Sequence, residues 1–470
     1  MLILSNNNLG FKVFKNETSM KKPTIVSGFS KLTKRKKIRW LVENFFVNSE
    51  EVARELKSFW YGDPQKQKIF DDFSENTISN FYLPYGVVPN LEINGKLYCV
   101  PMVIEESSVV AAASAAAKFW LKRGGFKAEI IATHKIGQVH FDWKGDYTKL
   151  YNVFSELKER ILKDTAEITF NMRERGGGIS KIELVNMTHL EANYYQLKMT
   201  FETCDSMGAN FINSCLEESA RSLRAFISEQ DSFAVEDRDV TIIMAILSNY
   251  TPECLVRTWV ECPVEDLGRF DGGNMDATTF AYKFDKALKI AHIDVHRATT
   301  HNKGIFNGID SVALATGNDF RAIESCGHTY AARDGSYKSL SSAKIENGIF
   351  KFWLDIPLAI GTVGGLTSLH PLAKRSLEML GKPSAEELMM VIAATGLAQN
   401  FAAVRSLVTT GIQQGHMKMH LMNILNHLEA TEKEVILVIS HFKDRLVSFA
   451  AVRDFLDLLR TKSAAELEMK

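Results

Sequence analysis

An alternation of strand and helix patterns in the middle of the chain constrains its fold most. Strand-like stretches alternate apolar and polar residues, and helix-like stretches repeat apolar residues every three or four positions. The strand patterns lie at 137–143, 181–187, 194–202 and 240–249, and the helix patterns at 153–161 and 211–227. This β-α-β-β-α-β order is typical of a ferredoxin-like domain. The sequence therefore predicts a compact α+β domain at residues 133–248.

The flanking sequence is mainly helical. EESSVVAAASAAAKFWLKRGG predicts a helix that begins near Ser107 and ends before Gly124. After residue 250, helix patterns occur at 275–293, 319–333, 370–381, 385–410 and 434–460, and a strand pattern occurs at 351–358. We therefore expect an α+β fold in which a large, mainly helical domain, residues 1–132 and 249–411, carries the small domain as an insertion. Residues 412–470 would form a separate helical segment.

Composition excludes several classes of function. The 56 basic and 56 acidic side chains cancel, so no overall field attracts nucleic acid. The six cysteines are scattered without a CxxC pair, which argues against zinc ribbons, dithiol redox sites and secreted disulfide frameworks. No stretch approaches the roughly 20 apolar residues of a membrane span, and MLILSNNN is too short for a signal peptide core. A cytoplasmic protein that binds neither membrane nor nucleic acid is expected.

One glycine-containing stretch is placed to bind an anion, although neither GxGxxG nor GxxxxGK[ST] occurs. DSMGAN (205–210) follows a strand that ends near Thr203 and precedes a helix that begins near Gly208. Free backbone N–H groups and the helix dipole would face an anion there. The alternative is that Asp205 simply caps this helix. The basic run KLTKRKKIR (31–39) is similarly open to two interpretations, a contact to an anionic ligand or a solvated helix face.

Four further segments carry side chains that suit proton transfer or charge stabilisation. Glu105 and Glu106 precede the alanine-rich helix, where they either complement its dipole or supply a general acid. HNKGIFNGID surrounds Lys303 with polar groups, and TGND places Asp319 at a helix N-cap. His416 follows a glycine in GHMKMH and is either structural or a proton donor on a moving segment. Without HExxH or another ligand spacing, no metal site is expected.

Taken together and in order, five motifs resemble 3-hydroxy-3-methylglutaryl-coenzyme A (HMG-CoA) reductases of the soluble bacterial class II. They are PMVIEESSVVAAAS, DSMGAN, RATTHNKGIFNGID, LATGND and GIQQGHMKMH, and similarity extends from about ENTISNFYLPYGVVPN to the C-terminal segment. The resemblance implies a small NAD(P)-binding domain inserted into a larger domain, with a mobile C-terminal flap. It also implies the reduction of HMG-CoA to mevalonate and CoA by two NAD(P)H, in homodimers or larger assemblies with active sites at the subunit interface.

The resemblance assigns roles residue by residue. The implied catalytic residues are Glu106, Lys303, Asp319 and His416, and the implied dinucleotide contacts are Asp205, Met207, Gly208 and Asn210. The implied substrate contacts are Arg297, Ser108, Asn249, Asn307, Glu75 and Asn76, with Lys31 reaching CoA phosphates.

The implied chemistry follows from charge. Lys303 would stabilise the oxyanion formed by hydride addition, and Asp319 would keep Lys303 charged. His416 would protonate the departing CoA thiolate, and Glu106 would supply the proton for aldehyde reduction. The glycines at 304 and 308 would let the backbone approach the substrate.

The sequence departs from the family pattern at two informative places. ENTIS has Ser79 where the family has glycine. Thr169 stands where some NADH-preferring members carry an acidic residue, and Arg173 and Arg175 lie nearby. A carboxylate there would repel a 2′-phosphate, so its absence favours NADPH over NADH. The alternatives are another acyl-CoA oxidoreductase on this scaffold, or an inactive CoA-binding paralogue. The intact set of four catalytic residues argues against the paralogue.

Overall fold

The computed structural model describes residues 25–411, 421–422, 424–442, 445 and 447–468. The chain divides into two compact units, Met1–Leu83 and Pro84–Lys470. The boundary at residue 83 falls inside the stretch that the sequence analysis assigned to the large domain. Each unit is described by itself.

The first unit consists of short helices. They are η1 (Phe29–Lys31), α1 (Lys34–Phe45), α2 (Ser49–Ser58) and α3 (Pro64–Asp71). Thr33 caps α1, and the Asp63 side chain caps α3, whose first residue is a proline. Most of the basic run at 31–39 lies in the first half of α1. Lys34 pairs there with Asp71 at 2.6 Å and lies over the Trp60 ring. The run is therefore partly a packed surface rather than a fully solvated face.

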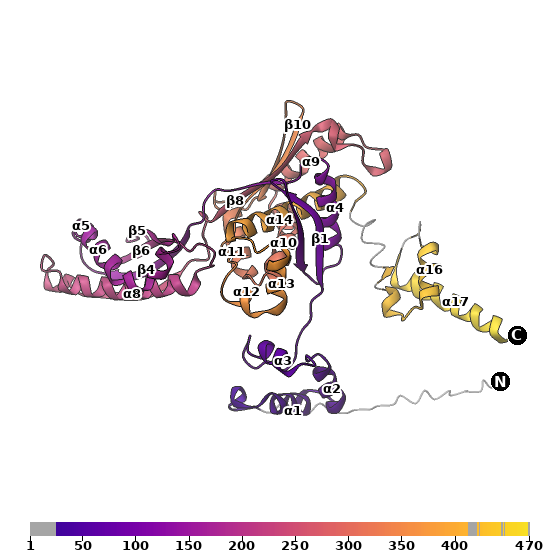
Figure 1. Cartoon of the computed structure of the whole chain (residues 1–470), viewed down its shortest axis with the longest axis horizontal. Helices are drawn as coiled ribbons and strands as arrows, with labels where there is room; N and C mark the ends of the chain where they lie inside the picture. The colour runs from indigo at the N-terminus through magenta and orange to yellow at the C-terminus, as the bar shows by residue number, and fades with distance from the viewer. Residues whose placement is uncertain (1–24, 412–420, 423, 443–444, 446, 469–470) are drawn as a thin grey trace, which may run out of the picture. The chain divides into compact units, whose positions relative to one another are not determined.

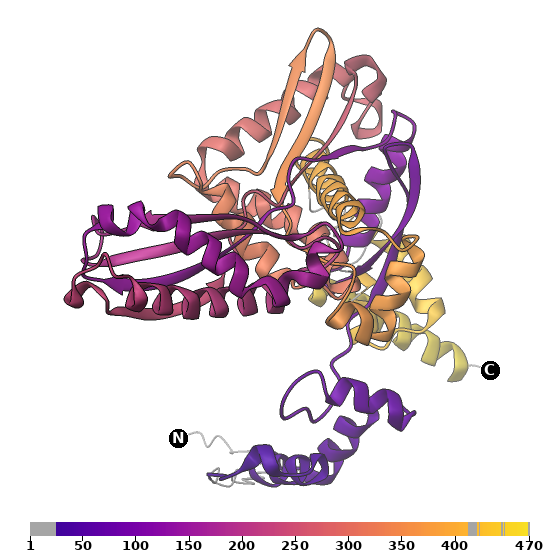
Figure 2. The ribbon, with the colours of Figure 1, turned by 60° about the vertical axis from the view of Figure 1, so that its left-hand side comes forward.

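The small domain has the predicted ferredoxin-like topology. Its elements are β4 (Lys135–Trp143), α5 (Tyr147–Asn152), α6 (Phe154–Asp164), α7 (Ala166–Arg173), β5 (Gly178–Asn186), β6 (Tyr194–Glu202), α8 (Ala209–Glu229) and β7 (Val240–Leu247). The sheet order is β5-β6-β4-β7, with every neighbouring pair antiparallel. Helix α8 packs against α6, β4 and β7 (Figures 1 and 2). A separate apolar core fills this domain, with Phe141, Leu197 and Leu223 fully buried.

The large domain combines two antiparallel sheets with helices. The sheets are the hairpin β1 (Tyr85–Ile93) and β2 (Lys96–Val103), and the order β3-β8-β10-β9. The latter strands are β3 (Lys127–Ile130), β8 (Leu255–Pro263), β9 (Ser341–Glu346) and β10 (Ile349–Pro357). The helices are α4 (Val109–Leu121), α9 (Ala277–Ile293), α10 (Val295–Ala315), α11 (Phe320–Ala331), α12 (Leu366–Leu369), α13 (Pro371–Met379) and α14 (Ala385–Val408).

Helix α14 is the central helix of this domain. It is long and apolar enough to cross a membrane, but 83% of its most apolar window is buried inside the protein. It packs against α4, α9 and α10. Its N-terminus has a capping box, in which Ser384 and Glu387 exchange hydrogen bonds. The length and apolar character of α14 therefore reflect its place in the core.

The sequence analysis did not anticipate strands β1, β2, β8 and β9, nor helix α10. Helix α10 runs through HNKGIFNGID and includes both of its glycines. A Cβ on Gly308 would lie 2.7 Å from the Thr395 carbonyl oxygen and 3.1 Å from Gly396 Cα, both on α14. Gly308 thus permits the close crossing of two helices. Gly304 has no atom within 4 Å of such a Cβ and so remains open.

The C-terminal segment contains α16 (Glu432–His441) and α17 (Phe449–Glu468). The single pattern at 434–460 therefore corresponds to two helices. Leu425, Val438 and Val452 belong to a third apolar core that is confined to this segment. The described part of the C-terminal segment therefore has an apolar core of its own.

Candidate functional site

The first half of the site is a cluster around Glu106. Lys303 and Asn307 lie one turn apart on α10, so their side chains share a face. Lys303 Nζ donates to Glu106 Oε2 at 2.5 Å, and Asn307 Nδ2 donates to the same oxygen at 3.4 Å. Glu106 precedes α4 rather than belonging to its first turn, and Ser108 holds a left-handed φ of 76° at the N-cap. The structure thus brings together three residues that the sequence analysis selected.

The ion pair between Lys303 and Glu106 contributes little to the stability of the fold. The side chains of Lys303 and Glu106 are 59% and 40% exposed. An ion pair in such contact with water contributes only about 0–1 kcal/mol to folding. The neighbouring His301 takes no part, because it is buried and hydrogen-bonded through Nε2 to Ser341 Oγ at 2.7 Å. Burial lowers the pKa of His301 to about 3, so its ring is neutral.

The second half of the site is the DSMGAN loop. Asp205 Oδ1 accepts from the Ala385 N–H at 2.7 Å, so Asp205 caps α14 and not α8. The N-cap of α8 is Gly208, with φ 85° and no capping side chain. The first amides of α8 therefore keep their capacity to bind an anion. The alternative that Asp205 caps the adjacent helix is wrong, because Asp205 connects the two domains instead.

A cavity of about 700 Å³ opens in front of this loop. Its lining comes from three segments, 206–211, 314–321 and 361–367, the last two with gaps. A Cβ on Gly208 would lie 2.5 Å from Thr203, and one on Gly361 would lie 2.5 Å from the Met207 nitrogen. The bare backbone, the uncapped helix start and the volume fit the pyrophosphate and nicotinamide parts of a dinucleotide.

The sequence analysis missed the third wall of this cavity. Gly364 and Gly365 line it, and Ser206 forms a parallel β-bridge with Val363. The VGG cluster at 363–365 was the available signal. Buried Lys135 was also missed, and it donates to Thr203 Oγ1 at 2.6 Å beneath the loop.

Asp319 belongs to the cavity and not to the Lys303 cluster. It caps α11 and pairs with Arg321 at 3.1 Å. Burial works against its ionisation, but the hydrogen bonds from Arg321 and the Ala322 amide hold the pKa of Asp319 below its usual value. Lys303 lies twelve residues before the end of α10, or about 18 Å along the helix. Within one chain, Asp319 and Lys303 therefore do not meet.

The other candidate substrate contacts of the second unit are dispersed. Arg297 lies six residues before Lys303, on a different face of α10. Burial lowers the pKa of Arg297, and Asp294 acts in the opposite direction. Asn249 is exposed after β7 and lines a small cavity with Met207 and Ala322.

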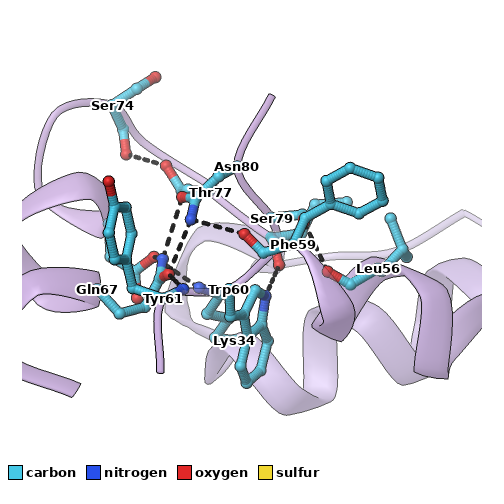
Figure 3. A network of polar contacts seen from close by, with 12 residues as sticks. Lys34, Leu56, Phe59, Trp60, Tyr61, Gln67, Ser74, Thr77, Ser79 and Asn80 are labelled. Atoms are coloured by element: carbon cyan, nitrogen blue, oxygen red, sulfur yellow. Dashed lines mark hydrogen bonds and ion pairs between the residues drawn. The ribbon is translucent and has the colours of Figure 1, made fainter. Parts of the chain in front are cut away.

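The first unit contains three exposed candidates, Lys31, Glu75 and Asn76. Asn76 adopts a left-handed φ of 58°. The following residues are fastened to α2 and its end, as Figure 3 shows: Ser79 Oγ donates to the Leu56 carbonyl at 2.6 Å, and Asn80 Nδ2 donates to the Phe59 carbonyl at 2.8 Å. The serine that replaces the family's glycine therefore anchors the ENTIS segment through its hydroxyl.

The side chain of Thr169 is buried. It is 4% exposed, and its hydroxyl donates to the Thr165 carbonyl at 3.0 Å. Arg173, the last residue of α7, and Arg175, in the turn that follows, are both exposed. The Cys204 thiol, next to Asp205, donates to the Arg175 carbonyl at 3.3 Å.

His416 lies outside the described residues. Among the residues that are described, no three His, Cys, Asp or Glu side chains gather as a metal site requires.

The chain is similar to proteins of one family over most of its length. The family model of hydroxymethylglutaryl-coenzyme A reductase matches residues 35–421. A 3-hydroxy-3-methylglutaryl-coenzyme A reductase of Archaeoglobus fulgidus is 35% identical over 93% of this chain and 95% of its own. A probable 3-hydroxy-3-methylglutaryl-coenzyme A reductase of Borreliella burgdorferi is 32% identical over 86% and 89%.

A solved structure gives the same result. The class II 3-hydroxy-3-methylglutaryl-CoA reductase of Streptococcus pneumoniae, bound to NADPH in open conformations, has a TM-score of 0.66 and 34% identity. The match covers 87% of this chain and 99% of that chain. The mixed helix and sheet architecture predicted from the sequence is thereby confirmed. The chain belongs to the hydroxymethylglutaryl-coenzyme A reductase family.

Proposed function

We propose that this protein reduces HMG-CoA to mevalonate and CoA with two equivalents of reduced nicotinamide dinucleotide, and catalyses the reverse oxidation. The observation that carries the proposal is the Glu106–Lys303 pair, held at 2.5 Å beside Asn307. It places a cation and a carboxyl group at one point, as a reaction that forms an oxyanion and then needs a proton requires.

The residues act in sequence. Lys303 stabilises the negative charge that develops on the thioester oxygen, while Asn307 helps to orient Glu106. The hemithioacetal then collapses to mevaldehyde, and His416 protonates the CoA thiolate. In the second reduction Lys303 again polarises the carbonyl group, and Glu106 delivers a proton to the alcohol oxygen. The reduced nicotinamide, when bound, supplies the hydride in both steps.

The protein is proposed to act as a cytoplasmic homodimer or larger assembly with active sites shared between subunits. In support, Lys303 and the helix end next to Asp319 are about 18 Å apart along α10, so one chain does not place the carboxylate beside the ammonium. A second copy of the chain would bring its Asp319 to Lys303 and favour the charged amine.

Subunit mixing tests this arrangement. Lys303→Ala and Asp319→Asn chains are expected to be inactive alone. After unfolding and reassembly together, about a quarter of wild-type activity should return, since half the dimers are mixed and each has one intact site. If mixing restores nothing, while size measurements show mixed dimers, both residues act from the same chain.

NADPH is proposed as the preferred cofactor because Arg175 lies in the turn beside the DSMGAN loop, and Arg173 ends the helix that precedes this turn. Either guanidinium would attract a 2′-phosphate. Arg175→Ala is expected to raise KM for NADPH about tenfold while changing KM for NADH less than twofold. The matched control is Arg224→Ala, an exposed arginine on α8. Equal changes for both cofactors would contradict the preference.

The function itself is tested by following the loss of reduced-nicotinamide absorbance with purified protein and HMG-CoA, separately with NADPH and NADH. Two nicotinamides oxidised for each HMG-CoA consumed would establish the four-electron reaction. No oxidation with either cofactor, in folded protein that binds CoA, would favour an inactive CoA-binding paralogue.

A further inference from the structure

A buried lysine is hydrogen-bonded to the DSMGAN loop. Lys135, the first residue of β4, is 4% exposed. Its Nζ donates to Thr203 Oγ1 at 2.6 Å and to the Ser206 carbonyl at 3.4 Å. Thr203 directly follows β6, and Ser206 is the second residue of the loop. The small domain therefore contacts the start of the loop through the ammonium group of Lys135.

This ammonium group has no carboxylate partner in the described part of the chain. Three acidic residues line a cavity of about 310 Å³ together with Lys135, but none of them forms an ion pair with it. Glu202 accepts from a hydroxyl group and a backbone amide, Asp205 accepts from the first amide of α14, and Glu386 is exposed. The positive charge of Lys135 is therefore not compensated by a neighbouring side chain.

A buried charge without a counter-ion does not serve stability. Moving an ammonium group out of water is costly, and an apolar side chain at such a place often stabilises a fold better. Lys135 lines a second, small cavity with Met207 and Ala209, at the start of α8. The uncapped amides of α8 carry partial positive charge at the same place. Both features favour an anion there.

The contacts of Lys135 also fix the shape of the turn. Thr203 Oγ1 accepts from Lys135 and donates to the Ser206 carbonyl at 2.7 Å, and Ser206 Oγ donates back to the Thr203 carbonyl at 3.0 Å. A Cβ on Gly208 would lie 2.5 Å from Thr203 Cγ2. Because Thr203 packs so closely against the N-cap of α8, the position of Thr203 determines where the first amides of α8 point.

We propose that Lys135 is a positioning residue for the dinucleotide. Its ammonium group holds the Thr203–Ser206 turn in the shape that directs the α8 amides at the pyrophosphate, and its uncompensated charge strengthens the attraction for that anion. This inference rests on the proposed function, since it concerns how the reduced nicotinamide is bound. NADPH and NADH share the pyrophosphate, so Lys135 should support both equally, in contrast to Arg175.

The experiment measures Kd for NADPH and NADH without HMG-CoA, from the fluorescence of the reduced nicotinamide. Lys135→Met removes the charge but keeps a long unbranched side chain. It should raise both Kd values by the same factor, at least about tenfold, because hydrogen bonds from a charged group are lost. KM for HMG-CoA at saturating cofactor should change less than twofold. Lys144→Met, an exposed lysine just after β4, is the matched control and should leave both Kd values unchanged.

A second pair of variants decides the matter even if Lys135→Met unfolds. Thr203→Val removes the hydroxyl group but keeps the side-chain shape against Gly208, and it should raise both Kd values about fivefold. Thr203→Ser keeps the hydroxyl group and should show a smaller increase. Combining Lys135→Met with Thr203→Val should raise Kd little beyond Lys135→Met alone, since both variants remove the same contact. Tm measured for each variant shows whether it is folded.

Unchanged Kd values in folded Lys135→Met and Thr203→Val would overturn the positioning role. So would a loss confined to NADPH, or equal changes in kcat and in KM for both substrates together with a lower Tm, which would mark a purely structural lysine. Wild type that binds both nicotinamides but does not reduce HMG-CoA would overturn the proposed function alone, and the Kd values would still decide the role of Lys135. Wild type that binds neither nicotinamide would overturn both.

Discussion

Lys303→Ala is expected to lower kcat/KM for HMG-CoA by about 10²–10³-fold, which is the usual cost of removing a donor to a developing oxyanion. The loss should appear mainly in kcat, because the charge that Lys303 meets is fully formed only in the transition state. The fold should persist, since the side chain is 59% exposed and its ion pair contributes little to stability. Steady-state loss of nicotinamide absorbance measures the first effect, and Tm measures the second.

Two further variants define what this loss means. Lys283→Ala removes an exposed lysine from neighbouring α9 and should change neither quantity. Lys303→Arg keeps the charge but replaces a compact ammonium by a larger planar group, so partial activity is expected. Normal turnover by Lys303→Ala would eliminate the oxyanion role. Loss of activity with a large drop in Tm would point to misfolding instead.

The small domain was predictable because its signal is local. Apolar and polar residues alternate along YYQLKMTFE, which matches β6 residue for residue, although Gln196 and Thr200 on its polar face are buried as well. Helix α8 likewise repeats its buried residues with helical spacing. Strand order followed from the known topology of this motif, and the observed order β5-β6-β4-β7 agrees with it.

Helix α10 was not predicted because its glycines pack against α14, which lies far from it in the sequence. Gly308 and Gly396 are small so that α10 and α14 can cross closely, and a Cβ on Gly396 would lie 2.7 Å from Ile309 Cγ1. From the local sequence alone, the pairs Lys303-Gly304 and Asn307-Gly308 would indicate turns. The division of the chain at residue 83 was not predicted either, because it depends on the tertiary contacts within each unit and not on a local pattern.

The candidate site shows the same contrast between local sequence signals and tertiary packing. The motifs selected Glu106, Lys303 and Asn307, which the structure brings into contact, and Asp319 and DSMGAN, which border one cavity. They did not predict that Asp205 caps α14, 180 residues later, or that Thr169 is buried. Both facts depend on tertiary packing, which a motif does not encode. The residue type shows what chemistry a side chain can perform, and the fold decides which groups it reaches.

Glu106→Gln is expected to reduce kcat for mevaldehyde reduction by about 10²–10⁴-fold, because the amide has the shape of the acid but no proton to transfer. The amide oxygen of this variant would still accept a hydrogen bond from Lys303, so substrate should bind with a KM within a few-fold of wild type. Stability should change by less than about 1 kcal/mol, since both partners are largely in contact with water.

The adjacent Glu105 supplies the matched control for this variant. Glu105 is exposed, lies in the same turn before α4 and lacks the contacts to Lys303 and Asn307 that Glu106 makes. Glu105→Gln removes the same charge from almost the same place, so it should retain full activity towards mevaldehyde. If both variants lose activity equally, the two carboxylates act through the local electric field. If only Glu106→Gln fails, the effect belongs to the proton that Glu106 carries, and this outcome would separate a general acid from a residue that merely holds Lys303.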